Sequence, residues 1–172
     1  MKTYALIGES GTGKSYNSIN LAASYNLDYI IDDGILIHKN KVVAGSSAKK
    51  ESNIIDAVKR AVFINDEHCN LVKSAIERVC PKGILVLGTS EKMVKKIRQR
   101  LNLPQYEKII KIEEVSTEED IKKARLMRQS QGKHVIPVPV MEIRKTFSGY
   151  FLDPLRVFRK NNYSSNIEDK SI

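Results

Sequence analysis

The feature that most constrains this chain is the segment GESGTGKS at residues 8–15, which joins an apolar run to a helical pattern. The run TYALI at residues 3–7 is typical of a buried strand, and the apolar spacing of residues 14–25 predicts a helix. The three glycines let the backbone curl, so that successive N–H groups point inward at the start of a helix whose dipole favours anions. The segment therefore predicts a phosphate-binding loop between a strand and a helix.

The pattern G-x-x-x-x-G-K-[ST] is complete in this segment, and it resembles the phosphate-binding loop of the P-loop NTPase superfamily. The resemblance implies an α/β fold of the three-layer α/β/α type with a mostly parallel sheet, and a nucleoside triphosphate bound with Mg²⁺. Lys14 is expected to neutralise charge that develops on the outer phosphates, and Ser15 is expected to hold Mg²⁺. The predicted phosphate-binding residues are Gly8, Glu9, Ser10, Gly11, Thr12, Gly13, Lys14 and Ser15.

Strand-like and helical segments alternate along the chain as far as residue 131. Strands are predicted over residues 3–7, 29–32, 61–64, 83–87 and 108–112, with a small hairpin or loop over 35–43. Helices are predicted over residues 14–25, 53–60, 67–79, 90–101 and 118–131. The alternation predicts a parallel sheet with helices on both faces.

Length and composition favour one domain. A chain of 172 residues with 41% hydrophobic side chains can bury a single core, and residues 1–158 are expected to form one nucleotide-binding domain. Within it, residues 132–158 carry prolines and aromatic side chains without a helical period, which predicts an irregular flap over the nucleotide or a docking surface for a partner. Residues 159–172 are polar and predict a flexible tail.

Two pairs of acidic residues follow apolar runs, and each is a candidate for the metal part of the site. Asp32 and Asp33 end YIIDDG, whereas Asp66 and Glu67 end VFINDE. One acid of such a pair can hold Mg²⁺ while another orients or deprotonates a nucleophile. We favour Asp32 as the metal ligand, together with Ser15, and Asp33 or Glu67 as the residue that acts on the nucleophile. The alternatives are a simple turn for the first pair and a helix N-terminus for the second.

A second resemblance covers residues 3–45. The order of GESGTGKS, a helix, DYIIDDGILI and a short hairpin resembles the P-loop region of the bacterial HPr kinase/phosphorylase family. This resemblance implies a kinase that phosphorylates a protein serine with ATP and Mg²⁺, with Ser15, Asp32 and Asp33 near the metal. The chain is also similar in general terms to small P-loop kinases, whose lids carry arginines.

Several other polar residues have two readings each. Arg125 and Arg128 suit a kinase lid, but basic residues also suit a helix C-terminus. Thr89 can contact the nucleotide at the end of the strand GILVL, and Ser90 is as well placed to cap the next helix. The three histidines are expected on the surface or satisfied in the core, and His134, which follows a glycine in the expected flap, is the best placed for function.

The net charge of +9 is spread along the chain, with its densest part in the helix at residues 92–100. A solvated helix face or a phosphate or nucleic-acid contact would explain it, and no nucleic-acid-binding motif favours the second. Two cysteines and the absence of a leader or a membrane-spanning run are typical of a cytoplasmic protein, and the cysteines are expected in the core.

These observations favour a Mg²⁺-dependent nucleotide-binding protein that hydrolyses the γ-phosphate or transfers it. ATP is favoured over GTP because the guanine-reading pattern Asn-Lys-x-Asp is absent. The alternatives are a nucleotide-dependent regulatory switch with little turnover, which acts on a protein partner, and a nucleic-acid-associated ATPase. The choice between a hydrolase and a kinase stays open, because both use the same phosphate-binding loop.

Overall fold

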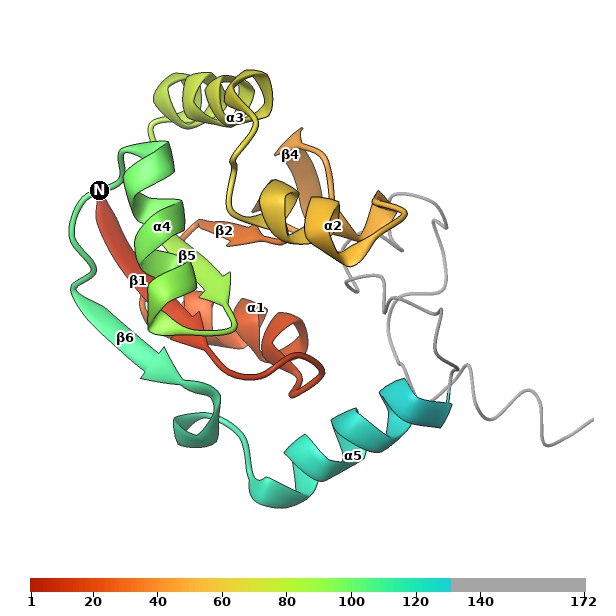
Figure 1. Cartoon of the computed structure of the whole chain (residues 1–172). Coiled ribbons are helices and arrows are strands. Elements are labelled where there is room, and N and C mark those ends of the chain that lie inside the picture. The colour runs from red at the N-terminus through yellow and green to blue at the C-terminus, as the bar shows by residue number, and fades with distance from the viewer. Residues whose placement is uncertain (131–172) are drawn as a thin grey trace, which may run out of the picture.

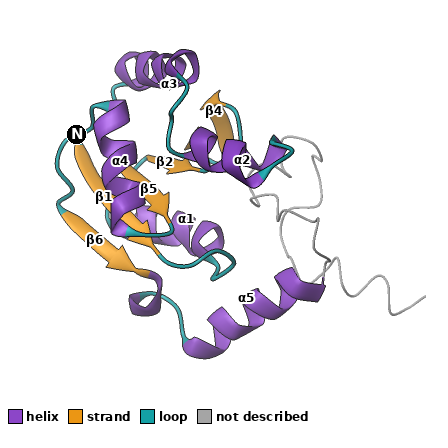
Figure 2. Ribbon diagram, in the orientation of Figure 1, coloured by secondary structure: helices purple, strands orange, loops and turns teal. Residues whose placement is uncertain are grey.

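The protein is built on a six-stranded sheet with the strand order β4-β3-β2-β5-β1-β6 (Figures 1 and 2). The computed structural model describes residues 1–130. Its strands are β1 (Lys2–Ile7), β2 (Tyr29–Asp32), β3 (Ile35–His38), β4 (Lys41–Gly45), β5 (Gly83–Gly88) and β6 (Lys108–Lys111). Its α-helices are α1 (Lys14–Ser24), α2 (Ile54–Ala61), α3 (Asp66–Val79), α4 (Glu91–Leu101) and α5 (Glu118–Ser130), with short 3₁₀ turns η1 (Ala48–Lys50) and η2 (Ile112–Glu114).

The sheet is mixed but mostly parallel. β1 pairs in parallel with β5 and β6, and β2 pairs in parallel with β5. β2, β3 and β4 form an antiparallel meander at one side of the sheet. The predicted hairpin over residues 35–43 is therefore confirmed, and an additional hairpin joins it to β2.

Both hairpins have two-residue loops whose backbone lies in the left-handed region. Asp33 and Gly34 have φ angles of 46° and 88°, and Lys39 and Asn40 have φ angles of 45° and 64°. Two positive φ values in succession match the right-handed twist of the flanking strands, and Asp-Gly is a preferred pair for such a loop. The turn directly after β2 thus follows from its sequence.

Helices cover both faces of the sheet because side chains alternate along the strands. Ile84 and Val86 of β5 pack with α3 and α4, whereas Leu85 and Leu87 pack with α1 and the start of α5. All four are fully or almost fully buried, and burying a side chain of this size stabilises a fold by about 1.5–3 kcal/mol. Two apolar layers therefore fix the sheet between the helices.

One predicted strand is wrong. Residues 61–64 form the end of α2 and its cap, and Phe63 is buried with φ of 58°. The N–H of Ile64 donates to the carbonyl of Lys59, and that of Phe63 donates to Arg60. This is a Schellman cap, and Phe63 packs into the core that α3 and α4 also line. The short apolar run thus ends a helix and forms no strand.

The other predicted elements agree with the structure to within a residue or two over residues 1–130. The prediction of two core cysteines is half right, because Cys69 is buried while Cys80 is exposed and ends α3 with φ of 44°. Across the described residues, no helix has both the length and the apolar character needed to cross a membrane. The predicted flap at 132–158, His134 and the tail at 159–172 lie outside the described residues.

Candidate functional site

The loop at residues 8–15, hereafter the glycine loop, leaves the carboxyl end of β1. Ile7 lies opposite Gly88 at the end of β5, and the N–H of Gly8 donates to the Gly88 carbonyl over 3.2 Å. β2 is parallel to β5 and ends at Asp32, so its carboxyl end lies at the same edge of the sheet. Open α/β sheets bind ligands at this edge.

The glycine loop curls around the ammonium group of Lys14. Gly11 and Gly13 have φ angles of 80° and 88°, a region that favours glycine. Lys14 Nζ donates to the carbonyls of Gly8 and Glu9 over 2.6 and 2.7 Å. Gly13 caps α1 without a side-chain hydrogen bond to the helix N-terminus. The loop therefore presents a positive group and the N-terminus of α1 together, which suits an anion.

Asp32 lies against the glycine loop. The Ser15 hydroxyl donates to Asp32 Oδ2 over 2.6 Å, although the two residues come from different elements. Asp32 is only 6% exposed. Burial, and next the neighbouring Asp33, raise the pKa of Asp32 to about 6, against the opposing effects of Lys49, Ser15 and Lys14. A hydroxyl and a carboxylate at hydrogen-bond distance are oxygen ligands of the kind that Mg²⁺ takes.

Asp33 is paired with a residue that the sequence analysis missed. Lys49 Nζ lies 3.4 Å from Asp33 Oδ2, and the Lys49 side chain is 15% exposed. The backbone holds this arrangement, because the N–H of Ala48 donates to the Asp33 carbonyl over 2.8 Å. In the sequence Lys49 is one of two adjacent lysines, and nothing there distinguishes it from Lys50.

The pKa of Lys14 is lowered, and burial is the main cause. The negative charges of Asp32 and Asp33 act in the opposite direction, and the positive charges of Arg128 and Lys49 add to the lowering. The site thus contains two lysines and two aspartates whose charges act on one another.

The second acidic pair lies elsewhere. Asp66 and Glu67 form the first turn of α3, where the Asn65 side chain accepts a hydrogen bond from the N–H of His68. Arg100 of α4 donates to Asp66 Oδ1 over 2.6 Å, and this bond lowers the pKa of Asp66. Within residues 1–130, no hydrogen bond or ion pair joins Asp66 or Glu67 to the glycine loop. The helix N-terminus that the sequence offered as an alternative is what the structure has.

His68 connects α3 to the turn that follows Asp32. Its Nε2 lies 2.8 Å from the carbonyl of Gly34 and 3.2 Å from the N–H of Ser46, and its ring stacks on Phe63. Burial lowers the pKa of His68, which favours a neutral ring. Nε2 can donate to the Gly34 carbonyl or accept from the Ser46 N–H, depending on the tautomer, and Nδ1 has no partner in the described part of the chain. His68 therefore supports the acidic turn.

Two arginines of α5 contact the glycine loop. Arg125 donates to Glu9 Oε2 over 2.7 Å, and Arg128 donates to the Ser10 hydroxyl. Both contacts involve exposed side chains. The structure thus brings the two arginines to the loop, and their role toward a phosphate stays a prediction.

The remaining candidates have structural contacts. Ser90 caps α4 and accepts from the N–H of Met93 over 3.3 Å. On α4, Arg98 donates to the Leu103 carbonyl, and Arg100 donates to the carbonyls of Phe63 and Ile64. These two arginines of the basic helix therefore stabilise the backbone segments next to that helix.

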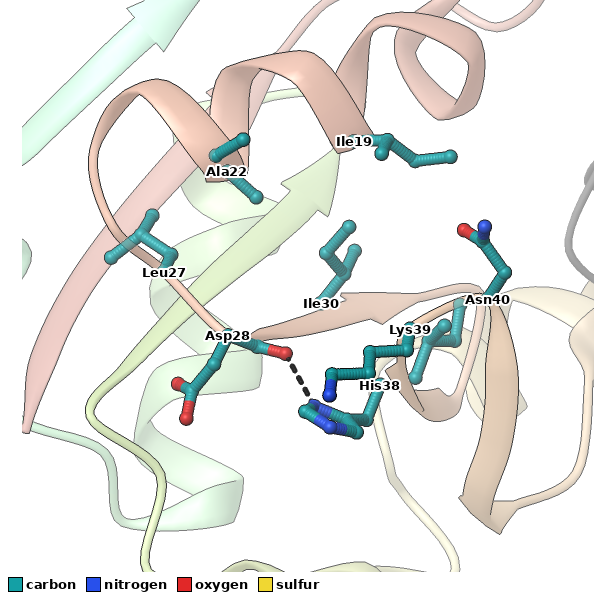
Figure 3. A pocket seen from close by; sticks show the side chains of 10 residues that line it. Ile19, Ala22, Leu27, Asp28, Ile30, His38, Lys39 and Asn40 are labelled. Carbon is teal, nitrogen blue, oxygen red and sulfur yellow. Dashed lines mark hydrogen bonds between the residues drawn. The ribbon is translucent and has the colours of Figure 1, made fainter.

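A hollow of about 210 Å³ lies beside the carboxyl-terminal half of α1 (Figure 3). His38 at its rim bonds the Asp28 carbonyl over 2.8 Å through Nδ1 and stacks on Tyr29. The lining residues are Ile19, Ala22, Ala23, Leu27, Asp28, Ile30, Ile37, His38, Lys39 and Asn40. None of the predicted site residues lines it, since the glycine loop lies at the other end of α1.

No protein-family model, curated protein or solved structure matches this chain.

Proposed function

We propose that this protein binds a nucleoside triphosphate, ATP in preference to GTP, with Mg²⁺ at the glycine loop. The γ-phosphate is then hydrolysed or transferred. In this proposal the sheet and its helices form a three-layer α/β/α fold of the P-loop NTPase type. The preference for ATP rests on the absence of a guanine-reading tetrad in the sequence.

One observation carries the proposal, namely the contact between Ser15 and Asp32. The two residues are 17 positions apart and belong to different elements, yet their oxygens lie 2.6 Å apart beside Lys14 of the same loop. A phosphate nest, a lysine and two metal-type oxygens at one sheet edge are the parts that phosphoryl transfer requires. A glycine-rich turn without a ligand would not require a buried carboxylate next to it.

The residues fit the groups that the proposal implies. Mg²⁺ would be held by the Ser15 hydroxyl and the Asp32 carboxylate, and it would supply charge neutralisation for the phosphates. Lys14 would exchange its two backbone carbonyls for phosphate oxygens, which offer it a stronger charge-assisted bond. Asp33 lies next in the chain and would orient a water molecule or an acceptor hydroxyl.

The identity of the acceptor belongs to the same proposal. A protein serine is supported by the resemblance of residues 3–45 to HPr kinase/phosphorylase, and water is the simplest acceptor. Glu67, the other candidate for this catalytic step, lies in the first turn of α3 and is exposed. Asp33 is therefore the better candidate.

A second candidate is a nucleotide-dependent switch. It is favoured by the contacts of Arg125 and Arg128 with Glu9 and Ser10, because they tie α5 to the loop that would receive the phosphates. A bound triphosphate would compete for these arginines and thereby change the position of α5. In this case nucleotide binding is tight and turnover is slow.

The experiment is titration of the full chain with ATP and with GTP, in the presence of Mg²⁺ and in EDTA, followed by phosphate release. Lys14→Ala is expected to weaken MgATP binding by about 100-fold, because a charge-assisted contact to the phosphates is lost. Lys39→Ala is the control. This lysine lies in the turn between β3 and β4, beside the carboxyl-terminal half of α1, whereas the glycine loop precedes the N-terminus of α1. Absence of MgATP binding by the folded wild-type protein contradicts the proposal.

A further inference from the structure

The candidate site contains a cation of its own beside the acidic turn. Lys49 lies on η1, directly after the β2-β3-β4 meander, and its ammonium group is 3.4 Å from Asp33 Oδ2. We propose that Lys49 is a resident counter-ion of the acidic pair Asp32–Asp33, which neutralises the pair in the metal-free protein and contacts the phosphates when Mg²⁺ and nucleotide bind. The contact of Lys49 with the phosphates rests on the proposed function.

Lys49 is held in place by its backbone. The Asp33 carbonyl accepts the N–H of Ala48 over 2.8 Å, and the Ser47 hydroxyl accepts the N–H of Lys49 itself over 3.2 Å. The same carboxyl-bearing residue thus anchors the turn by its main chain and pairs with the lysine by its side chain. A surface ion pair formed by two mobile side chains lacks such an anchor.

The other lysine of the site has different partners. Lys14 Nζ donates to two carbonyls of the glycine loop, so its hydrogen bonds are directed at the loop and not at the carboxylates. Among the described residues, Lys49 forms the one ion pair to Asp32 or Asp33. The buried position of Asp32 makes a second cation near the pair valuable, because water screens its charge poorly.

Lys49 and a divalent cation therefore compete for the same negative charge. Mg²⁺ that approaches Asp32 supplies the charge that Lys49 supplies in its absence, and the two cations repel one another. A triphosphate adds negative charge at the same place and gives Lys49 new oxygen partners. Lys49 is thus expected to oppose binding of the bare metal and to favour binding of the metal with nucleotide.

The first arm of the test uses MgCl₂ alone, without nucleotide, and follows thermal unfolding of the full chain. Lys49→Met is expected to lower the Mg²⁺ concentration that gives half of the stabilisation by about tenfold. Lys50→Met is the matched control, because Lys50 is the exposed neighbour of Lys49 on the same turn, and it is expected to change that concentration less than twofold. Equal Mg²⁺ responses of Lys49→Met and Lys50→Met overturn the counter-ion role.

The second arm measures MgATP binding by calorimetry. Lys49→Met is expected to weaken MgATP binding by about tenfold, opposite in sign to its effect on Mg²⁺ alone, and Lys49→Arg is expected to restore both values to within about threefold. A merely structural role would shift both in the same direction. Circular dichroism checks that each variant folds, and Lys49→Gln replaces Lys49→Met if that variant does not.

The two arms separate this proposal from the proposed function. If the wild-type protein does not bind MgATP, the proposed function fails, while the first arm still decides whether Lys49 neutralises the acidic pair. If the wild type binds MgATP in a Lys14-dependent manner and Lys49→Met behaves like Lys50→Met, the proposed function stands and the role of Lys49 is refuted.

Discussion

The protein has two acidic pairs that each follow an apolar run, Asp32–Asp33 and Asp66–Glu67. The two pairs differ in burial and in their hydrogen-bond partners. Asp32 is 6% exposed and bonds Ser15 of the glycine loop, whereas the Asp66 side chain is 84% exposed and bonds Arg100. The first pair ends a strand and enters a tight turn. The second pair begins a helix, where acidic side chains complement the helix dipole.

The secondary-structure element before an acidic pair therefore decides where the pair lies and what it can bind. β2 is parallel to β5, so its carboxyl end reaches the edge of the sheet from which the glycine loop leaves. The apolar run before Asp66 ends α2 and forms its cap, so this pair does not follow a strand of the sheet. Burial then raises the pKa of Asp32, while the Arg100 hydrogen bond lowers the pKa of Asp66.

The largest expected difference between the pairs is in turnover. Asp32→Asn is expected to lower phosphate release from ATP by about 100-fold, because the amide replaces a charged metal ligand while keeping its size. Asp66→Asn is the matched control and is expected to change the rate less than twofold. Steady-state phosphate release at saturating MgATP measures both. A loss of activity in Asp66→Asn with an active Asp32→Asn would exchange the roles of the two pairs.

The second difference is in the pH dependence of stability. Since the pKa of Asp32 is raised from 3.8 to about 6, the folded protein binds this proton more tightly than the unfolded chain does. Its contribution to the free energy of unfolding therefore falls as the pH rises from about 4 to about 6, by on the order of 3 kcal/mol. For Asp66 the sign is opposite, because a lowered pKa gives stability that is lost as the pH falls below its ordinary value of 3.8.

Urea unfolding in EDTA at several pH values checks this prediction. The difference between wild type and Asp32→Asn should decline across pH 4–6 and then stay constant, and Asp32→Asn should be the more stable protein at pH 7. The difference between wild type and Asp66→Asn should change below about pH 4 instead. Parallel curves for wild type and Asp32→Asn would show that Asp32 is not perturbed by burial.

The smallest expected effect concerns His68, which joins α3 to the turn that follows Asp32. His68→Ala removes a buried ring that stacks on Phe63 and bonds Gly34, and it should lower the free energy of unfolding by about 2 kcal/mol. Because Gly34 follows the acidic pair, MgATP binding should also weaken by about fivefold. The matched control is His38→Ala, since His38 also stacks on an aromatic ring and bonds a carbonyl, but beside the hollow of Figure 3.

Calorimetry and urea unfolding of both histidine variants separate stability from binding. His38→Ala should destabilise the fold and leave MgATP affinity within about twofold of the wild type. An equal loss of affinity in both variants would mean that the effect is general loss of stability and that α3 gives no specific support to the acidic turn.

Local patterns predicted most of the elements. The alternation of strand and helix patterns, the Asp-Gly turn and the capping residue Ser90 all depend on near neighbours in the chain, so the sequence carries them directly. The exception is the strand predicted over residues 61–64. The run at 61–64 is apolar and short, and such a run reads as a strand or as the packed end of a helix until its partner is known.

The sequence alone determined the glycine loop, the strand before it and the helix after it. It also identified the two candidate acidic pairs. The tertiary structure decided which pair meets the loop, because that depends on the strand order β2-β5-β1, which no local pattern encodes. It also decided that Lys49, and not Lys50, faces Asp33, and that His68 lies beneath the acidic turn. These contacts join residues far apart in the chain, and only packing of the sheet against its helices brings them together.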